Sequence, residues 1–223
     1  MVKVHKQFAA GKAEIDAAIA AAEKGTTGEL VVVATPRAGS YAHAESAFAF
    51  AVSLVAFAAT WILGQKITYA EWTSMPGIFI GVWASCLVLI AGYVVGQIIL
   101  KLFPRIGPLL TSKRHIAEEV ERAAAYAFRK FHVEQTKGAT GVLIFVAELE
   151  RTVVVMGDAT IAREVKTEEW EAARDAILAG IKQGQPIEGL KNGIGKAGDL
   201  LRTHCPCRED EDSDELTSEM HLS

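Results

Sequence analysis

Two long apolar segments interrupt this chain between stretches of ordinary globular composition. Residues 46–64 form an almost unbroken apolar run, and residues 77–100 form another in which Gln97 is the one strongly polar side chain. About 20 such residues cross the hydrocarbon core of a bilayer as a helix, because a helix pairs its own backbone polar groups where water is absent. The sequence therefore predicts a transmembrane hairpin of two helices.

Strand-like segments lie on both sides of this hairpin. Residues 30–35 precede it, whereas residues 141–147 and 152–156 follow it. A single short strand cannot bury its own faces or pair its own backbone, so the first strand must join the later ones. Both ends of the hairpin should therefore lie on the same side of the membrane, which an even number of spans satisfies.

The remaining pattern predicts an α/β domain that is split by the hairpin. Its order is helix, strand, hairpin, helix, strand, strand, helix, helix, with the first two strands parallel and the third antiparallel to the second. We assign residues 1–40 and 105–204 to the two parts of this domain and residues 41–104 to the hairpin. Residues 205–223 are acidic and low in apolar content, so we expect a disordered tail.

The distribution of charge limits the partners and the orientation. A net charge of −4 over 223 residues argues against nucleic acid as a partner, because binding to phosphates needs a basic surface. Lys and Arg are frequent before the first span and after the second, whereas the connecting residues 65–76 carry only Lys66. Since such an excess marks the cytoplasmic side, we expect both termini in the cytoplasm.

Two sequence motifs resemble ligand-binding sites but have simpler explanations. Gly193, Gly195 and Gly198 match the dinucleotide-binding pattern, but they lie within a predicted helix instead of between a strand and a helix, so we reject a nucleotide cofactor. These glycines instead favour close packing of helices. His204, Cys205 and Cys207 are soft metal ligands, yet a second pair of ligands is missing, and a solvated tail is the simpler interpretation.

A pair of carboxylates gives the strongest candidate site. Glu29 begins the first strand and Asp158 ends the third, which runs the opposite way, so both fall at the same edge of the sheet. Two carboxylates there could hold a divalent cation such as Ca²⁺ through oxygen ligands. The alternative is that both are turn and edge residues. Glu148, Glu150 and Arg151 lie at the opposite edge and are most simply a solvated turn.

Several motifs together resemble those of the TPM domain family, over most of the chain outside the spans. The matching residues are Thr27-Gly28-Glu29-Leu-Val-Val-Val, Gly141-Val-Leu-Ile-Phe-Val, Glu150-Arg151-Thr-Val-Val-Val-Met-Gly157-Asp158, Trp170, Gly189-Leu190, Ile194, His204-Cys205-Pro206 and Glu215-Leu216. The last of these resemble a bacterial membrane subgroup with an inserted hairpin. The resemblance implies a three-layer α/β domain, here in a bacterial inner membrane. Many members place this domain outside the cytoplasm, which conflicts with the charge bias of this chain.

Two functions follow as hypotheses. The first is a non-enzymatic, membrane-anchored module that assists another membrane protein or a second copy of itself. The second is a metal-dependent phosphatase that uses Glu29 and Asp158, since TPM members have been linked to acid phosphatase activity and calcium affinity. The chain lacks the sequence motifs of serine hydrolases, zinc proteases and phosphate loops, which favours the first hypothesis.

Overall fold

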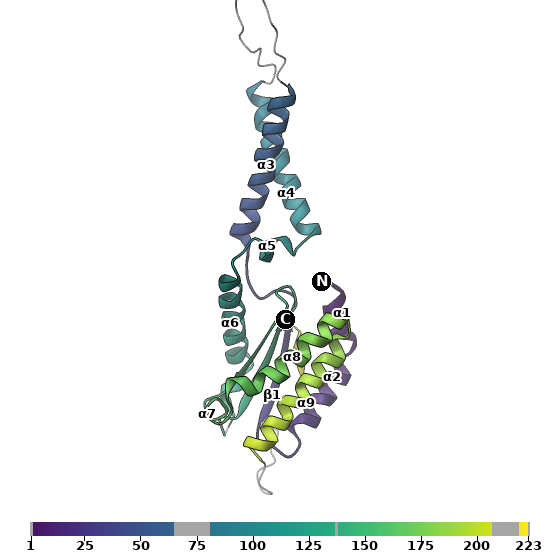
Figure 1. Ribbon diagram of the computed structural model, residues 1–223, viewed down its shortest axis with the longest axis vertical. Coiled ribbons are helices and arrows are strands. Elements are labelled where there is room, and N and C mark those ends of the chain that lie inside the picture. Colours follow the sequence, from purple (N-terminus) through teal and green to yellow (C-terminus); the bar gives the residue numbers. More distant parts are fainter. Residues whose placement is uncertain (1, 65–80, 137, 207–218, 223) are drawn as a thin grey trace, which may run out of the picture. The chain divides into compact units, whose positions relative to one another are not determined.

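A computed structural model of the chain describes residues 2–64, 81–136, 138–206 and 219–222. The order of elements is α1 (Val2–Ala10), α2 (Lys12–Glu23), β1 (Glu29–Thr35), α3 (Ala42–Gly64), α4 (Val82–Leu102), α5 (Ile106–Leu109), α6 (Lys113–Lys130), the 3₁₀ helix η1 (Val133–Gln135), β2 (Gly141–Ala147), β3 (Thr152–Gly157), α7 (Ile161–Glu164), α8 (Thr167–Gln183), α9 (Pro186–His204) and β4 (Met220–Leu222) (Figure 1).

The chain forms two compact units. One unit combines Met1–Ser40 with Arg114–Ser223, and the other comprises Tyr41–Lys113. The first is a mixed α/β unit whose sheet has the order β3-β2-β1-β4. β1 pairs with β2 in parallel along its whole length, and β3 runs antiparallel to β2. The predicted split α/β fold and the predicted strand directions are therefore confirmed.

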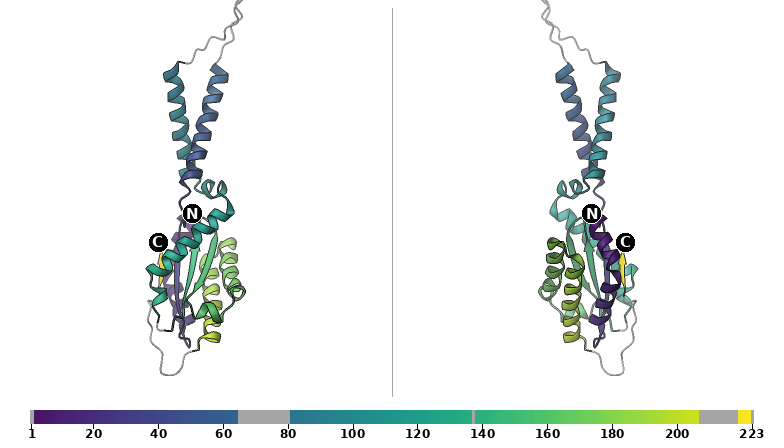
Figure 2. Two further views of the ribbon diagram at one scale, coloured as in Figure 1. Left: turned by 90° about the vertical axis from the view of Figure 1, so that its left-hand side faces the viewer. Right: turned by 90° about the vertical axis from the view of Figure 1, so that its right-hand side faces the viewer.

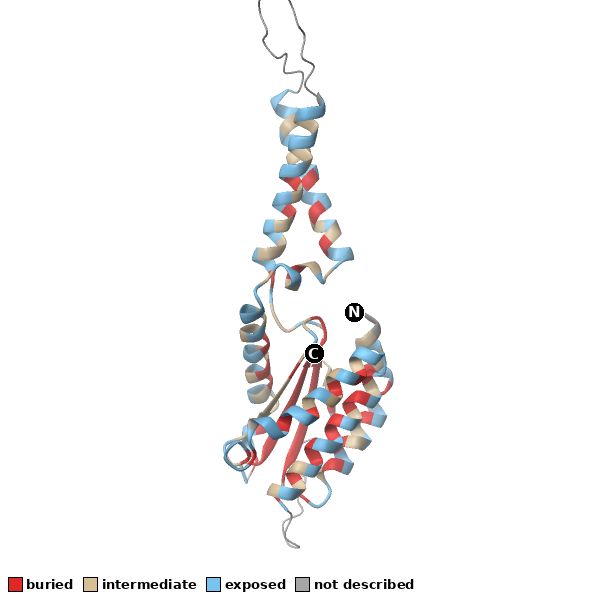
Figure 3. Ribbon diagram, in the orientation of Figure 1, coloured by how far each residue is buried: buried red, intermediate tan, exposed pale blue. Residues whose placement is uncertain are grey.

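Helices cover both faces of the sheet, which makes three layers. The α1, α2, α8 and α9 helices lie on one face and α6 lies on the other, as the two side views show (Figure 2). All residues of β1 and β2 are buried (Figure 3). Their alternate side chains enter opposite cores, because successive residues of a strand point to opposite faces. Leu30 and Val32 enter the core under α2 and α9, whereas Val31 and Val33 enter the core under α6.

The second unit contains two helices that are long and apolar enough to cross a membrane, Ala42–Leu63 and Val82–Leu102, as judged by length and composition. Only 11% of each is buried within the protein, so neither resembles the core helix of a soluble domain. They pack through small residues, since a Cβ on Gly96 would lie 2.6 Å from the Cα of Ala49. Ser53 Oγ also donates a hydrogen bond to the Leu89 carbonyl at 2.7 Å. Gly92 and Gly96 of α4 therefore serve the pairing of the two helices.

Two details differ from the sequence prediction. The single helix expected before the first strand is two helices, α1 and α2, separated at Gly11, where a Cβ would lie 2.5 Å from Ile187 Cδ1 on α9. In addition, Met220–Leu222 form β4, so the tail is not disordered throughout. Met220 is 1% exposed within the main core, and this burial stabilises the strand. The many acidic residues just before it hide this strand from a prediction based on composition. Residues 207–218 of the tail lie outside the described residues.

Candidate functional site

The predicted carboxylate pair lies at one end of the sheet, as its strand directions require. Glu29 is paired with Gly141 of β2, and the Asp158 backbone N–H donates to the Gly141 carbonyl at 2.8 Å. β2 therefore separates the two acids, and with strands about 4.8 Å apart their backbones are on the order of 10 Å from each other. Asp158 Oδ1 accepts a hydrogen bond from the Ala159 N–H at 2.6 Å, as a turn residue does. A shared cation at Glu29 and Asp158 stays a prediction.

Local hydrogen bonds fix this end of the sheet. Thr140 Oγ1 donates to the Thr27 carbonyl at 2.7 Å, and Thr26 Oγ1 donates to the Cys205 carbonyl at 2.6 Å. Cys205 is buried, and desolvation raises the pKa of its thiol, so the thiolate that a soft metal needs is disfavoured. His204 instead lies 3.6 Å from Glu169. Within the described residues, no group of three or more His, Cys, Asp or Glu side chains is arranged to hold a metal ion.

The opposite end of the sheet holds a buried acid that sequence reasoning missed. Glu148 was expected in a solvated turn, yet its side chain is only 2% exposed and its Oε1 lies 2.9 Å from His5 Nδ1. The Glu148 N–H donates to the Thr35 carbonyl, which extends the β1–β2 pairing and holds the acid under α1. Phe8 anchors α1 in the core and so brings His5 to this position. The one indication in the sequence that Glu148 is buried was its two apolar neighbours, Ala147 and Leu149.

Glu148 carries the chemical interest of this end. Desolvation raises the pKa of its carboxyl, while the contacts with His5 lower it by a smaller amount. Its second oxygen, Oε2, is buried and has no hydrogen-bond partner among the described residues. An acid and an imidazole in contact can exchange a proton, and the carboxyl ends of parallel strands are a common place for ligands. We interpret the pair as a proton-sensitive joint between α1 and the sheet.

This joint predicts a specific pH dependence. A raised pKa in the folded state means that the contribution of Glu148 to stability is fully present below its ordinary pKa of 4.5 and is lost as the pH rises through the folded-state pKa. We expect Glu148→Gln to remove this loss, so that the unfolding temperature of the variant falls less between pH 4.5 and pH 7.5 than that of the wild type. The exposed Glu168→Gln is the control. Parallel pH profiles for the wild type and Glu148→Gln would contradict the joint.

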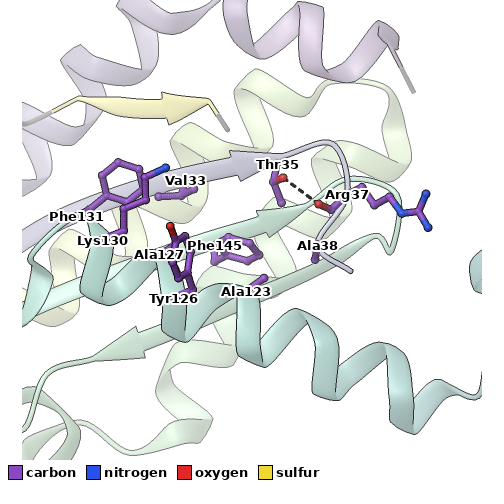
Figure 4. A pocket seen from close by; sticks show the side chains of 10 residues that line it. All are labelled: Val33, Thr35, Arg37, Ala38, Ala123, Tyr126, Ala127, Lys130, Phe131 and Phe145. Carbon is purple, nitrogen blue, oxygen red and sulfur yellow. Dashed lines mark hydrogen bonds between the residues drawn. The ribbon is translucent and has the colours of Figure 1, made fainter. Parts of the chain in front are cut away.

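A pocket lies on the other face of the sheet, between β1, β2 and α6. It has a volume of about 160 Å³, and Val33, Phe145, Tyr126, Lys130 and Phe131 contribute to its lining (Figure 4). The Lys130 amine lies 5.3 Å from the centre of the Phe131 ring, within the range of a cation–π contact. Arg37 contributes to the lining as well, but its guanidinium points away from the pocket (Figure 4). A cavity of this size holds one ring or one branched side chain.

Among the comparisons with known proteins, a solved structure supports the fold. No protein-family model and no curated protein sequence matches the chain. The chain is similar to a solved structure described as the NMR structure of the BA42 protein from the psychrophilic bacterium Bizionia argentinensis. The TM-score is 0.55 at 23% sequence identity, and the match covers 96% of this chain and 94% of that chain. At this identity the likeness supports the fold alone.

Proposed function

We propose that this protein is a membrane-anchored, non-enzymatic accessory module, related to TPM domains, whose α/β unit binds a neighbouring membrane protein. One observation carries the proposal: the apolar hairpin is inserted between β1 and β2, which are adjacent strands of one sheet. The chain leaves β1 at Thr35 and enters α3 at Ala42. A connection this short limits how far the domain can move from a bilayer, and this restriction suits contact with a membrane neighbour.

The proposed location is a bacterial inner membrane with the domain in the cytoplasm. Lys101 lies in the last turn of α4, and Arg105, Lys113 and Arg114 follow that helix closely. Such an excess of positive charge is typical of cytoplasmic segments. The exposed apolar surface of α3 and α4 supports their burial in lipid, since Leu63 is 84% exposed and Trp83 is 87% exposed. Ion transport is not part of the proposal, because the middle of each helix lacks the ionisable side chains that such pathways use.

The topology predicts the outcome of a reporter experiment. Sidedness reporters fused at Met1 and at Ser223 should both indicate the cytoplasm, while a reporter within residues 65–76 should indicate the outside. The physical reason is that β1 and β2 must share one compartment in order to pair. Opposite sides for the two termini would contradict the fold in a membrane. Two termini outside would overturn the orientation alone.

The function itself is tested by cross-linking in intact membranes. Photo-reactive residues placed at exposed positions such as Tyr126 on α6 should label a defined membrane protein. The same preparation should show no phosphatase activity with Ca²⁺ or Mn²⁺ above that of Glu29→Gln combined with Asp158→Asn. Phosphate release that this double variant abolishes would favour a metal-dependent phosphatase in place of a binding module. Absence of any labelled neighbour would overturn the proposed module.

A further inference from the structure

The strand β4 is a minor member of the sheet, attached at its edge. It pairs in parallel with β1 over only Val32–Ala34, whereas β2 pairs with all of β1. In the sequence, residues 205–219 separate the end of α9 from β4. Few backbone hydrogen bonds hold such a strand, and the edge it covers can accept any extended peptide of suitable chemistry.

Side-chain contacts define what that edge recognises. Met220 is 1% exposed in the main core, and its backbone N–H donates to Asp16 Oδ1 on α2 at 2.8 Å. Before it, Glu219 forms an ion pair with Lys12 at 3.1 Å. After it, His221 stacks on Phe131 of the α6 side, with the ring centres 4.1 Å apart. The recognised pattern is an acid, a buried apolar side chain and a flat ring.

The edge is also limited in length. The Leu30 N–H donates to Glu23 Oε1 at 2.8 Å, so the side chain of Glu23 occupies the donor that precedes the paired stretch. Alternate residues of a strand direct their N–H groups to the same side, so Val32 and Ala34 follow Leu30 in facing this edge. The end of α2 and the carboxylate of Glu23 therefore close one end of the edge, and the remaining length of the edge fits a strand as short as β4. We call this space, bounded by Lys12, Asp16, Glu23, β1 and Phe131, the β1 slot.

We propose that the β1 slot is a peptide-docking site, that β4 is its intramolecular occupant, and that an extended segment of the neighbouring membrane protein displaces β4. The inference deepens the proposed function and rests on it. The partner segment carries an acidic residue followed by a large flexible apolar residue, as β4 does. Lys12, which also pairs with Asp16 at 2.8 Å, contacts the acid of β4 at Glu219, and the Met220 position supplies a deep apolar site. Because β4 belongs to the same chain, its local concentration at the slot is high. The partner segment therefore competes with β4 only when the bilayer also raises the local concentration of the partner.

Peptide exchange tests the slot on the full-length chain in detergent. A site for a specific protease replaces residues 209–214, and the probe is a fluorescent peptide of residues 217–223. After cleavage β4 is no longer tethered, and we expect the probe to bind at least tenfold more tightly than it binds the uncut chain. A probe carrying Met220→Asp should not bind. Equal affinity for cut and uncut chains, or no exchange in a cut chain that still melts cooperatively, would overturn the slot.

Cross-linking in membranes tests the partner. A photo-reactive residue at Ala20, an exposed position one turn beyond Asp16 on α2, leaves Lys12 in place. It should label another protein more strongly in a chain carrying Met220→Asp, or in the cleaved chain, than in the otherwise unchanged chain. A control probe at Tyr126 should label the neighbour equally in all of them. If the Tyr126 probe labels a neighbour and the Ala20 signal is unchanged, the slot inference fails and the proposed function stands. If neither probe labels any protein, both fail. An adduct of two copies of this chain would show self-docking and overturn the assigned partner.

Discussion

Val32→Asp is expected to unfold the α/β unit. Val32 is fully buried in the second of three layers, where its side chain faces the core under α2 and α9. An unpaired carboxylate in such a place costs more than about 4 kcal/mol, a large share of the roughly 5–15 kcal/mol that stabilises a domain. The measurement is limited proteolysis of the segment that follows Thr111. This segment comes after the apolar hairpin in the sequence, whereas Val32 comes before it, so cleavage there reports on the coupling of the two parts.

The control for this variant is Val32→Ala. It removes two methyl groups without adding charge, so we expect a loss of about 1–3 kcal/mol and a folded domain. Rapid cleavage after Thr111 in Val32→Asp and slow cleavage in Val32→Ala would confirm that β1 and β2 form one cooperative core. Equal resistance in both would mean that the segments before and after the hairpin fold independently, against the observed parallel pairing.

Local patterns were sufficient to predict the main elements. Four consecutive apolar residues from Leu30 to Val33 predicted a strand covered on both faces, and the same pattern predicted β2. The pairing followed because a single short strand cannot stand alone, and the parallel direction followed from the helical connection between the two strands. The apolar length of α3 and α4 predicted the hairpin directly.

The features that were missed depend on distant residues. Gly11 lies between α1 and α2, and Ile187 of α9 packs where a side chain at this position would lie. The neighbouring sequence does not reveal that contact. Glu148 is buried because α1 places His5 over it. The charged residues shortly after Glu148 in the sequence do not show this contact, so they predicted a solvated acid. β4 was missed because three residues after an acidic run are too few to show the alternation typical of a strand. Their strand conformation depends on the burial of Met220 in the core.

The second large effect concerns the glycines of α9. A Cβ on Gly198 would lie 2.8 Å from the Cα of Ala22 on α2, and a Cβ on Gly193 would lie 2.3 Å from Ile177 Cγ1 on α8. We expect Gly198→Val to separate α2 from α9 and to destabilise the domain by about 1–3 kcal/mol or more, because backbone atoms cannot move aside as a side chain can. Thermal unfolding of the full chain in detergent measures the loss.

Gly195 supplies a matched control in the same helix. Nothing lies within 4 Å of the Cβ that Gly195→Ala would add, and alanine favours a helix by about 1 kcal/mol relative to glycine. We therefore expect Gly195→Ala to stabilise the domain slightly. A dinucleotide-binding loop would need all the glycines for its ligand, whereas packing needs only Gly193 and Gly198. Destabilisation by Gly195→Ala equal to that by Gly198→Val would contradict the packing explanation.

The position of the hairpin between two paired strands has a consequence for biosynthesis. A ribosome completes β1 at Thr35 but does not begin β2 until Gly141, and both apolar helices emerge in between. At about 5–20 residues per second, β1 waits on the order of 5 to 20 s for its partner. Over that interval the nascent chain exposes a strand of Leu and Val residues that has nothing to pair with. With the proposed membrane location, insertion of the two helices precedes folding of the sheet, and a chaperone that shields the first segment would act in this interval.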